Sequence, residues 1–335
     1  MKKIFCFILI FLMLFSYISI NAFAENNVSP RSSTILLRAG GGGGGQIVLG
    51  KNVTSIGSSA FYNSSNLKTV VNLSNLSLTK GSTNNGYVAY YVDKIVSVPN
   101  GVIDGDYIWS VADGVNTLAA YIGNATELTL PANYNGEDYR IGASVFSGNT
   151  TLTSVTISDA VTSIGNDAFK GCTALASVSI GNGVTSIGNC AFYGCSSLAS
   201  IEIPDAVTNL GAYAFQNCTS LASVSIGSGV TSIGNYAFNG CTALKDLRFE
   251  DGEGTLSLGY KSSSQGLFYD CPLESLYLDR NLSYSSSSSY SPFYSRTALT
   301  SLTIGDKVTS IGNYLFYSCS SLASVTMGSG VESIG

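Results

Sequence analysis

Histidine is absent from this 335-residue chain, and the absence removes several kinds of chemistry at once. Without histidine there is no Ser-His or Cys-His pair for nucleophilic catalysis and no histidine-based zinc site. The cysteines contain no C-x-x-C pair that would bind a metal instead. We therefore expect no enzyme activity, no cofactor and no bound metal.

Charged residues are also scarce, at 11% of the chain, and the formal net charge is −5. Nucleic-acid binding needs a basic surface, so we expect no nucleic-acid partner. Tryptophan occurs once, whereas tyrosine occurs 20 times. The surface must consist largely of Ser, Thr, Asn, Gly and Tyr, the residue types of adaptable protein-binding surfaces. A general bias of secreted repeat proteins explains the same composition equally well.

Long apolar runs are absent except at the N-terminus, where one covers residues 4–20 behind two lysines. The small-residue site Ala22-Phe23-Ala24 follows, so the segment predicts a secretory signal peptide over residues 1–24. An uncleaved membrane anchor is the alternative, because the run approaches spanning length. After cleavage we expect no membrane span, and we expect the protein to be secreted or held at the cell surface.

What the chain does contain is a repeat of 23 residues. Copies of V-T-S-I-G or a close variant restart every 23 residues in two blocks, which begin at Val161, Val184, Val207 and Val230, and then at Val308 and Val331. A fixed period of this length predicts a solenoid, because one such unit cannot bury a hydrophobic core alone.

Each repeat predicts one coil with two inward-facing segments. Leu175-x-x-Val178-x-Ile180 predicts a short strand in a parallel stack, and Val184-x-x-Ile187 returns to the core on the other side. The Ala-Phe pair between such segments predicts a single helical turn with the Phe as the main core residue. A glycine recurs at one position, which predicts positive φ or close backbone approach there; it is Gly57, Gly142, Gly165, Gly188, Gly211, Gly234 and Gly312.

The full pattern, L-x-x-V-x-I-(P)-x-x-V-x-x-I-G-x-x-A-F-x-x-C-x-x-L, resembles the BspA-like type of bacterial leucine-rich repeat. It fits residues 141–248 and 298–335 closely, and 53–70 as one unit. We predict a leucine-rich repeat solenoid with a parallel β-sheet on one face and short strands, turns and single helical turns on the other. The resemblance implies a secreted or surface-exposed protein, of a kind associated with adhesion to host matrix proteins and other microbes.

Breaks in the period predict the organisation of the chain. The expected parts are a signal peptide (1–24), a flexible Gly-rich linker (25–45), a first repeat (46–71), a β-rich interruption or cap with a hairpin at Asp113-Gly114 (72–140), regular repeats (141–249), divergent repeats with loop insertions (250–297) and further regular repeats (298–335). The last repeat stops at its Ile-Gly step, so we expect either a fragment of a longer chain or an end that docks onto a partner.

Five cysteines share one repeat position: Cys172, Cys195, Cys218, Cys241 and Cys319. Stacked coils would place them about 5 Å apart, a spacing that permits disulfides in an exported protein. The position recurs once per coil, however, and Asn63 and Asn149 stand near it in other units. This pattern favours free, buried thiols.

The outward strand positions are the candidate protein-binding face, with these residues in chain order: Ser200, Glu202, Ser223, Ser225, Lys245, Asp246 and Arg248. The charged trio Lys245, Asp246 and Arg248 adjoins the insertions and is the candidate hot spot; simple repeat drift is the alternative. The sequence favours a secreted or surface adhesin that binds protein ligands such as host extracellular matrix. A structural stalk that presents another module is the second hypothesis.

Overall fold

The computed structural model describes residues 18–20, 35–39, 45–252, 254–259, 266–284 and 291–335. This part of the chain is β-strand and turn, with one 3-10 turn, η1, at Asn85–Tyr87. The chain divides into two compact units: Met1–Ser110 with Ala119–Asn124, and Val111–Leu118 with Ala125–Gly335. The predicted signal peptide lies outside the described residues except for 18–20, so it stays a prediction.

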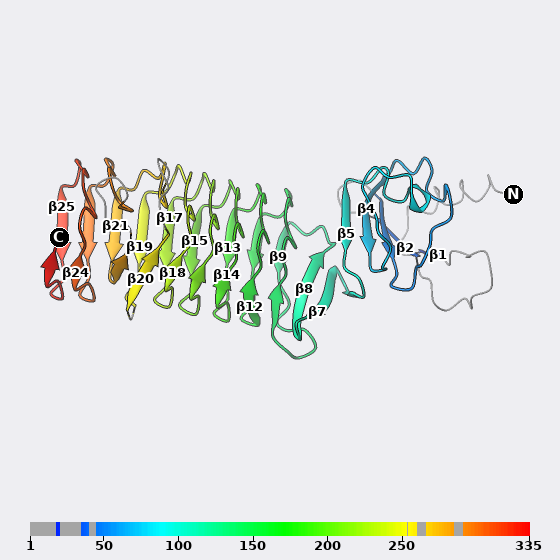
Figure 1. The fold of residues 1–335 in the computed structure, drawn as a ribbon, viewed down its shortest axis with the longest axis horizontal. Coiled ribbons are helices and arrows are strands. Elements are labelled where there is room, and N and C mark those ends of the chain that lie inside the picture. The colour runs from blue at the N-terminus through cyan, green and yellow to red at the C-terminus, as the bar shows by residue number, and fades with distance from the viewer. Residues whose placement is uncertain (1–17, 21–34, 40–44, 253, 260–265, 285–290) are drawn as a thin grey trace. The chain divides into compact units, whose positions relative to one another are not determined.

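The first unit contains a five-stranded sheet with strands in sequence order (Figure 1). Its strands are β1 (Ile18–Ile20), β2 (Ile35–Ala39), β3 (Gly45–Leu49), β4 (Leu67–Asn72) and β5 (Lys94–Ser97). Strands β1, β2 and β3 pair antiparallel, whereas β3, β4 and β5 pair parallel. The segment predicted as a flexible linker, residues 25–45, thus contains a paired strand in its described part.

Both faces of this sheet are covered by apolar side chains. Ile47 and Val70 belong to one core cluster, and Val48 and Val71 belong to another. Ile47 pairs with Val70 and Val70 pairs with Ile95, so the parallel ladder continues into the segment predicted as an interruption.

A meander of strands follows this ladder. Strands β6 (Val102–Asp104) and β7 (Tyr107–Ala112) pair antiparallel across a two-residue turn. Strand β8 (Val115–Tyr121) is the neighbour of β7 in its sheet and follows Asp113-Gly114. Both turn residues have positive φ, as a two-residue hairpin of the type I′ class requires. The described strands thus turn at Asp113-Gly114, where the hairpin was predicted.

The second unit is a stack of coils whose strands form two parallel ladders (Figure 1). The first ladder consists of a three-stranded sheet, β9 (Glu127–Thr129), β11 (Ser154–Thr156) and β13 (Ser177–Ser179), and a six-stranded sheet, β15 (Ser200–Ile203), β17 (Ser223–Ile226), β19 (Asp246–Phe249), β21 (Ser275–Leu278), β23 (Ser301–Ile304) and β25 (Ser324–Met327).

The second ladder is formed by the shorter return segments of the coils. Its strands are β10 (Tyr139–Ile141), β12 (Val161–Ile164), β14 (Ser186–Ile187), β16 (Asn209–Leu210), β18 (Ser232–Ile233), β20 (Thr255–Leu258) and β22 (Asn281–Ser283), followed by the pair β24 (Ser310–Ile311) and β26 (Ser333–Ile334). Register partners such as Ser186 and Asn209 are one repeat apart, which confirms the predicted solenoid.

The phenylalanines of successive coils form one column in the interior. Neighbouring ring centroids are 4.8 to 5.5 Å apart and the planes differ by at most 5° along the first part of the column, which contains Phe146, Phe169, Phe192, Phe215 and Phe238. Phe268, Phe293 and Phe316 extend it through the divergent coils. The predicted alignment of the rings is confirmed.

The single helical turns predicted beside the Phe column are not formed; tight turns replace them. The amide of Lys170 donates to Asp167 and that of Cys172 to Phe169, both over three residues. Asp167 has φ of 55° and Gly171 has φ of 69°. Two left-handed residues four positions apart prevent a right-handed helix from continuing.

The recurring glycine serves close approach between coils. A Cβ atom on Gly165 would lie 2.7 Å from the carbonyl carbon of Gly142, and one on Gly211 would lie 2.5 Å from that of Gly188. Positive φ occurs two residues later, at non-glycine positions such as Cys190. Of the two readings of this glycine, close approach is confirmed.

The cysteine column is buried beside the Phe column. All seven cysteines of the described residues are free. Six thiols each donate to a phenylalanine carbonyl of the preceding coil at 3.1 to 3.2 Å; they belong to Cys172, Cys195, Cys218, Cys241, Cys271 and Cys319. The structure thus agrees with free thiols and adds Cys271 to the five predicted members.

The divergent coils keep the register of the first ladder despite their insertions. Asp246 pairs with Ser275, and Ser275 pairs with Ser301. Residues 260–265 and the serine run 285–289 fall outside the described residues. Arg280 is buried in this region and donates to the carbonyls of Ser228 and Val230 at 2.6 and 2.7 Å.

Candidate functional site

The outward positions of the first ladder form straight rows of side chains, because side chains alternate along a strand and the coils are in register. Inward positions such as Val224 and Leu247 are buried. One outward row contains Ser200, Ser223, Asp246, Ser275, Ser301 and Ser324. The next contains Glu202, Ser225, Arg248, Tyr277, Thr303 and Thr326.

These rows bring the predicted binding residues together on one surface, which we call the strand face. Six of the seven are members of the two rows, on β15, β17 and β19. The seventh, Lys245, is exposed and immediately precedes β19. The assignment of these residues to binding remains a prediction.

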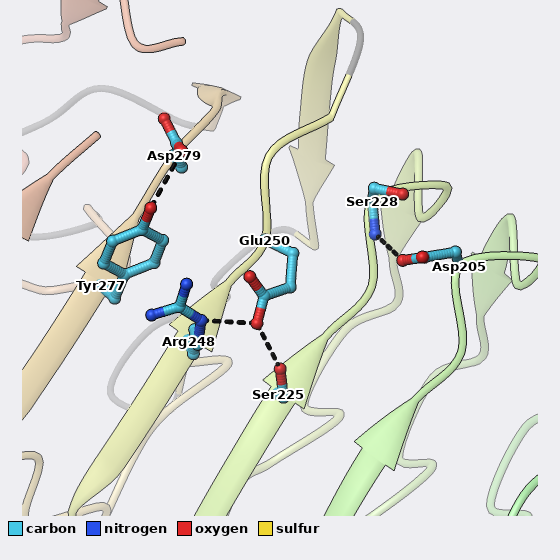
Figure 2. Close-up of polar contacts among 7 residues, drawn as sticks. All are labelled: Asp205, Ser225, Ser228, Arg248, Glu250, Tyr277 and Asp279. Carbon is cyan, nitrogen blue, oxygen red and sulfur yellow. Dashed lines mark hydrogen bonds and ion pairs between the residues drawn. The ribbon is translucent and has the colours of Figure 1, made fainter. Parts of the chain in front are cut away.

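Arg248 is the centre of a fixed polar network on this face (Figure 2). Its Nε donates to Oε1 of Glu250 at 2.5 Å, and the same oxygen accepts from the hydroxyl of Ser225 at 2.9 Å. The guanidinium carbon lies 3.6 Å from the ring centroid of Tyr277 on the adjacent strand. The Tyr277 hydroxyl donates to Asp279 at 2.9 Å. The arginine is thereby held in one orientation while its side chain stays about half exposed.

Lys245 is paired in the same way, with Glu274 of the next coil at 2.8 Å. The hydrogen bond to Glu274 raises the pKa of Lys245, and the hydrogen bond to Glu250 raises the pKa of Arg248. Asp246 and Glu202 are exposed and make no ion pair within the described chain. Both cations of the predicted hot spot are therefore neutralised within the protein.

A second set of carboxylates lies at the turns that follow the strands and holds adjacent coils together. Asp205 accepts from the amide of Ser228 at 2.7 Å (Figure 2), and Asp306 accepts from the amide of Ser329 at 2.7 Å. The hydrogen bonds from Ser329 lower the pKa of Asp306. The carboxylates are part of the solenoid scaffold.

Sequence reasoning missed the partners of the charged trio. Glu250 lies in the segment predicted to contain divergent repeats with loop insertions. An insertion precedes Glu274, Tyr277 and Asp279 and obscures their repeat positions. The pattern S-L-Y-L at Ser275–Leu278 was the available signal, because it matches S-L-T-I at Ser301–Ile304. Aligning both with D-L-R-F at Asp246–Phe249 places Tyr277 beside Arg248.

No enclosed ligand site accompanies the strand face in the described part of the chain. A partly open pocket bordered by Tyr269, Tyr284 and Arg296 has a volume of about 20 Å³, enough for one water molecule. Among the described residues, no group of three or more Cys, Asp or Glu side chains is placed to hold a metal ion. A search of the same residues finds no helix that is long and apolar enough to span a bilayer.

Solved structures of bacterial leucine-rich repeat proteins resemble this chain. A leucine-rich repeat protein of T. pallidum is 25% identical, with a TM-score of 0.47 over 64% of this chain and 89% of its own. The pneumococcal vaccine antigen PcpA is 19% identical, with a TM-score of 0.43 over 72% of this chain and 66% of its own. A leucine-rich cell surface protein of Faecalibacterium prausnitzii is 21% identical, with a TM-score of 0.21 over 69% and 95%.

A comparison with curated protein sequences finds no match. The model of the BspA type leucine rich repeat region (6 copies) matches residues 45–85, 139–257 and 253–335. These ranges cover more than half of the chain and contain both ladders of the second unit except for strand β9. The protein belongs to the BspA-type leucine-rich repeat family.

Proposed function

We propose that this protein is an adhesin, exported and displayed at the cell surface, that binds a protein partner through the strand face. The family supports a role at the surface, and leucine-rich repeat solenoids present extended surfaces to partners. We expect no enzyme activity, because the strand face offers an open row of side chains and the chain has no histidine.

The observation that carries the proposal is the stack of Arg248 on Tyr277. Arginine and tyrosine dominate the binding energy of protein interfaces, and they contribute most when they are rigid before binding. Glu250 and Asp279 hold this pair in place from either side. The flanking positions of the same row, Ser225 and Thr303, are small, so a partner can approach the pair closely along the row.

A panel of purified extracellular matrix proteins, immobilised and titrated with the protein, tests this proposal. Replacing Lys245, Asp246 and Arg248 by Ser should weaken binding to the recognised protein more than tenfold, which corresponds to about 1.4 kcal/mol. The melting temperature should stay nearly unchanged, because all three positions are exposed.

The matched control removes another exposed ion pair, that of Lys170 with Asp167 at 3.0 Å. The variant Asp167→Asn with Lys170→Ser should bind as the wild type does. Equal binding by both variants would remove the strand face from the proposal. An absence of binding to every matrix protein would favour the stalk hypothesis.

A further inference from the structure

Four tyrosines in the first unit form an exposed cluster that the strand face does not include. The ring of Tyr87 contacts Tyr62 and Tyr90, and Tyr90 also contacts Tyr91. The ring centroids are 5.2 Å apart for Tyr62–Tyr87, 5.5 Å for Tyr87–Tyr90 and 4.8 Å for Tyr90–Tyr91, with interplanar angles of 79°, 64° and 79°. Tyr62 is 56% exposed and Tyr90 is 42% exposed. We call these four residues the tyrosine cluster.

The backbone places Tyr87 at the surface although its repeat position belongs to the core. In a regular coil the amide of Phe169 donates to the carbonyl of Ala191, and Phe192 follows as the core residue. In the first unit the amide of Phe61 donates in the same way to the carbonyl of Gly86 at 2.7 Å. Tyr87 therefore takes the place of the core phenylalanine.

A left-handed turn points the Tyr87 side chain away from the core. Asn85, Gly86 and Tyr87 have φ of 51°, 64° and 67°, a conformation that a tyrosine rarely adopts. Gly86 is required there, because a Cβ atom would lie 2.3 Å from the carbonyl oxygen of Gly57. Val88 enters the core instead and is fully buried. The turn thus moves an aromatic ring from the interior to the surface, between Tyr62 and Tyr90.

The segments that supply the rings of the cluster carry no charge, although charged residues flank them at Lys51, Lys68, Lys80 and Asp93. The two segments that supply its rings, residues 52–67 and 81–92, contain no Asp, Glu, Lys or Arg. A surface with fixed charges repels its own copy across a two-fold axis, whereas a neutral surface does not. Edge-to-face packing joins the positive edge of one ring to the negative face of another, so a group of tyrosines contains both halves of the contact.

We infer that the tyrosine cluster is a self-association surface, and that its partner is the same cluster on a second copy of this chain. Aromatic residues with few neighbouring charges are typical of the centre of a protein interface. The strand face differs, because it carries exposed charged side chains of both signs, such as Glu202, Lys245 and Asp246.

Sedimentation of the purified protein over a range of concentrations tests the inference. The mass should rise toward that of a dimer by about 100 µM. Replacing both Tyr62 and Tyr90 by Ser should raise the dimer dissociation constant at least tenfold. Raising the salt from about 0.05 to 0.5 M should leave the wild-type constant unchanged, because no charge pairs are involved.

Two controls separate this surface from others. Replacing Tyr213 and Tyr314 by Ser removes two exposed tyrosines of the second unit and should leave the dimer intact. Replacing Val325 and Met327 by Ser removes exposed apolar side chains of the last described coil and should also leave it intact. If the dimer is lost only when Val325 and Met327 are replaced, the inference is overturned.

A charge insertion provides a test that keeps every ring. Asn84 is exposed and lies three residues before Tyr87. Asn84→Lys should weaken the dimer at low salt and recover it at high salt, because like charges then meet across the two-fold axis. A wild-type protein that stays monomeric up to about 100 µM overturns the inference. The inference is also overturned if the wild-type protein is a monomer and replacing Tyr62 and Tyr90 by Ser only weakens its binding to a matrix protein.

Discussion

The cysteine column illustrates how one residue type serves one task in every coil. Each thiol donates to the carbonyl of a phenylalanine in the preceding coil, for example Cys218 to Phe192 at 3.2 Å. A buried carbonyl without a donor costs roughly 1–3 kcal/mol, so a small side chain with a weak donor suits this position. The thiols are scaffold groups, and burial raises the pKa of Cys195, Cys218 and Cys319.

The stability of the protein should therefore decrease at alkaline pH. Burial raises the pKa of the Cys218 thiol from 9.0 to about 12. Below pH 9 this thiol is protonated in both the folded and the unfolded state, so its contribution to the free energy of unfolding is fully present. Between about pH 9 and 12 only the unfolded state loses the proton, so the free energy of unfolding falls by up to about 1.4 kcal/mol per pH unit.

Urea unfolding of the wild type and of Cys218→Ala at several pH values measures this effect. The variant should lose less stability with rising pH, by about one proton between pH 9 and 12. Cys218 of the wild type should react with iodoacetamide only after denaturation. Identical pH slopes in the two proteins would show that the thiol ionises equally in both states.

The Phe column makes a second prediction at this scale. Phe192 is fully buried between Phe169 and Phe215. Phe192→Ala should lower the free energy of unfolding by about 3–5 kcal/mol, because it removes a core ring and leaves a cavity. Urea unfolding gives the value, and exposed Ser200→Ala should change it by less than about 0.5 kcal/mol. A loss of less than about 1 kcal/mol would mean that the Phe192 ring contributes little to the stability of the core.

At the scale of the element, the strands and their inward residues were predictable but the turns between them were not. Period-two alternation places Val224 and Ile226 inward, and the structure agrees. The left-handed positions are occupied by residues as different as Asp167, Cys190 and Tyr213. No shared residue type marks them, so the sequence suggested a helical turn where two left-handed residues form a tight turn.

The strand face shows the same limit. Its rows follow from the repeat period, which is why Lys245, Asp246 and Arg248 were placed together correctly. The stack of Arg248 on Tyr277 follows once their two strands are aligned across the insertion. The ion pairs with Glu250 and Glu274 depend on side-chain orientations that the repeat spacing does not specify, so the neutralisation of both cations appeared only in three dimensions.

Arg280 is an element-scale feature that an isolated repeat does not explain. Its side chain reaches back about 50 residues to hold two turn carbonyls, and burial lowers its pKa. Arg280→Ala should lower the free energy of unfolding by about 2–4 kcal/mol, because two buried carbonyls lose a charged donor.

Chemical denaturation measures this loss. Lys307→Ala is the charge-matched control, since Lys307 is exposed, and it should change the value by less than about 0.5 kcal/mol. Equal effects of the two substitutions would mean that net charge, and not the clamp on the turn, determines the stability of this region.

At the scale of the whole molecule, stability follows from contacts between neighbouring coils. Each coil of the second unit pairs with the one before and the one after it, and the first unit has core clusters of its own. Stability in such a stack is approximately a sum of coil terms and neighbour terms. A local defect should therefore open the coils beside it before the rest of the chain.

Gly211→Val tests this nearest-neighbour behaviour. A Cβ atom at Gly211 would lie 2.5 Å from the amide nitrogen of Asn189 and from the carbonyl carbon of Gly188, so the two coils must separate. Hydrogen exchange should show the greatest loss of protection in strands β14, β16 and β18, with less loss toward β23. The amides of β3 and β4 in the first unit should exchange as in the wild type. A uniform loss of protection across both units would mean that the chain unfolds as one cooperative body, and the additive description of the coils would not apply.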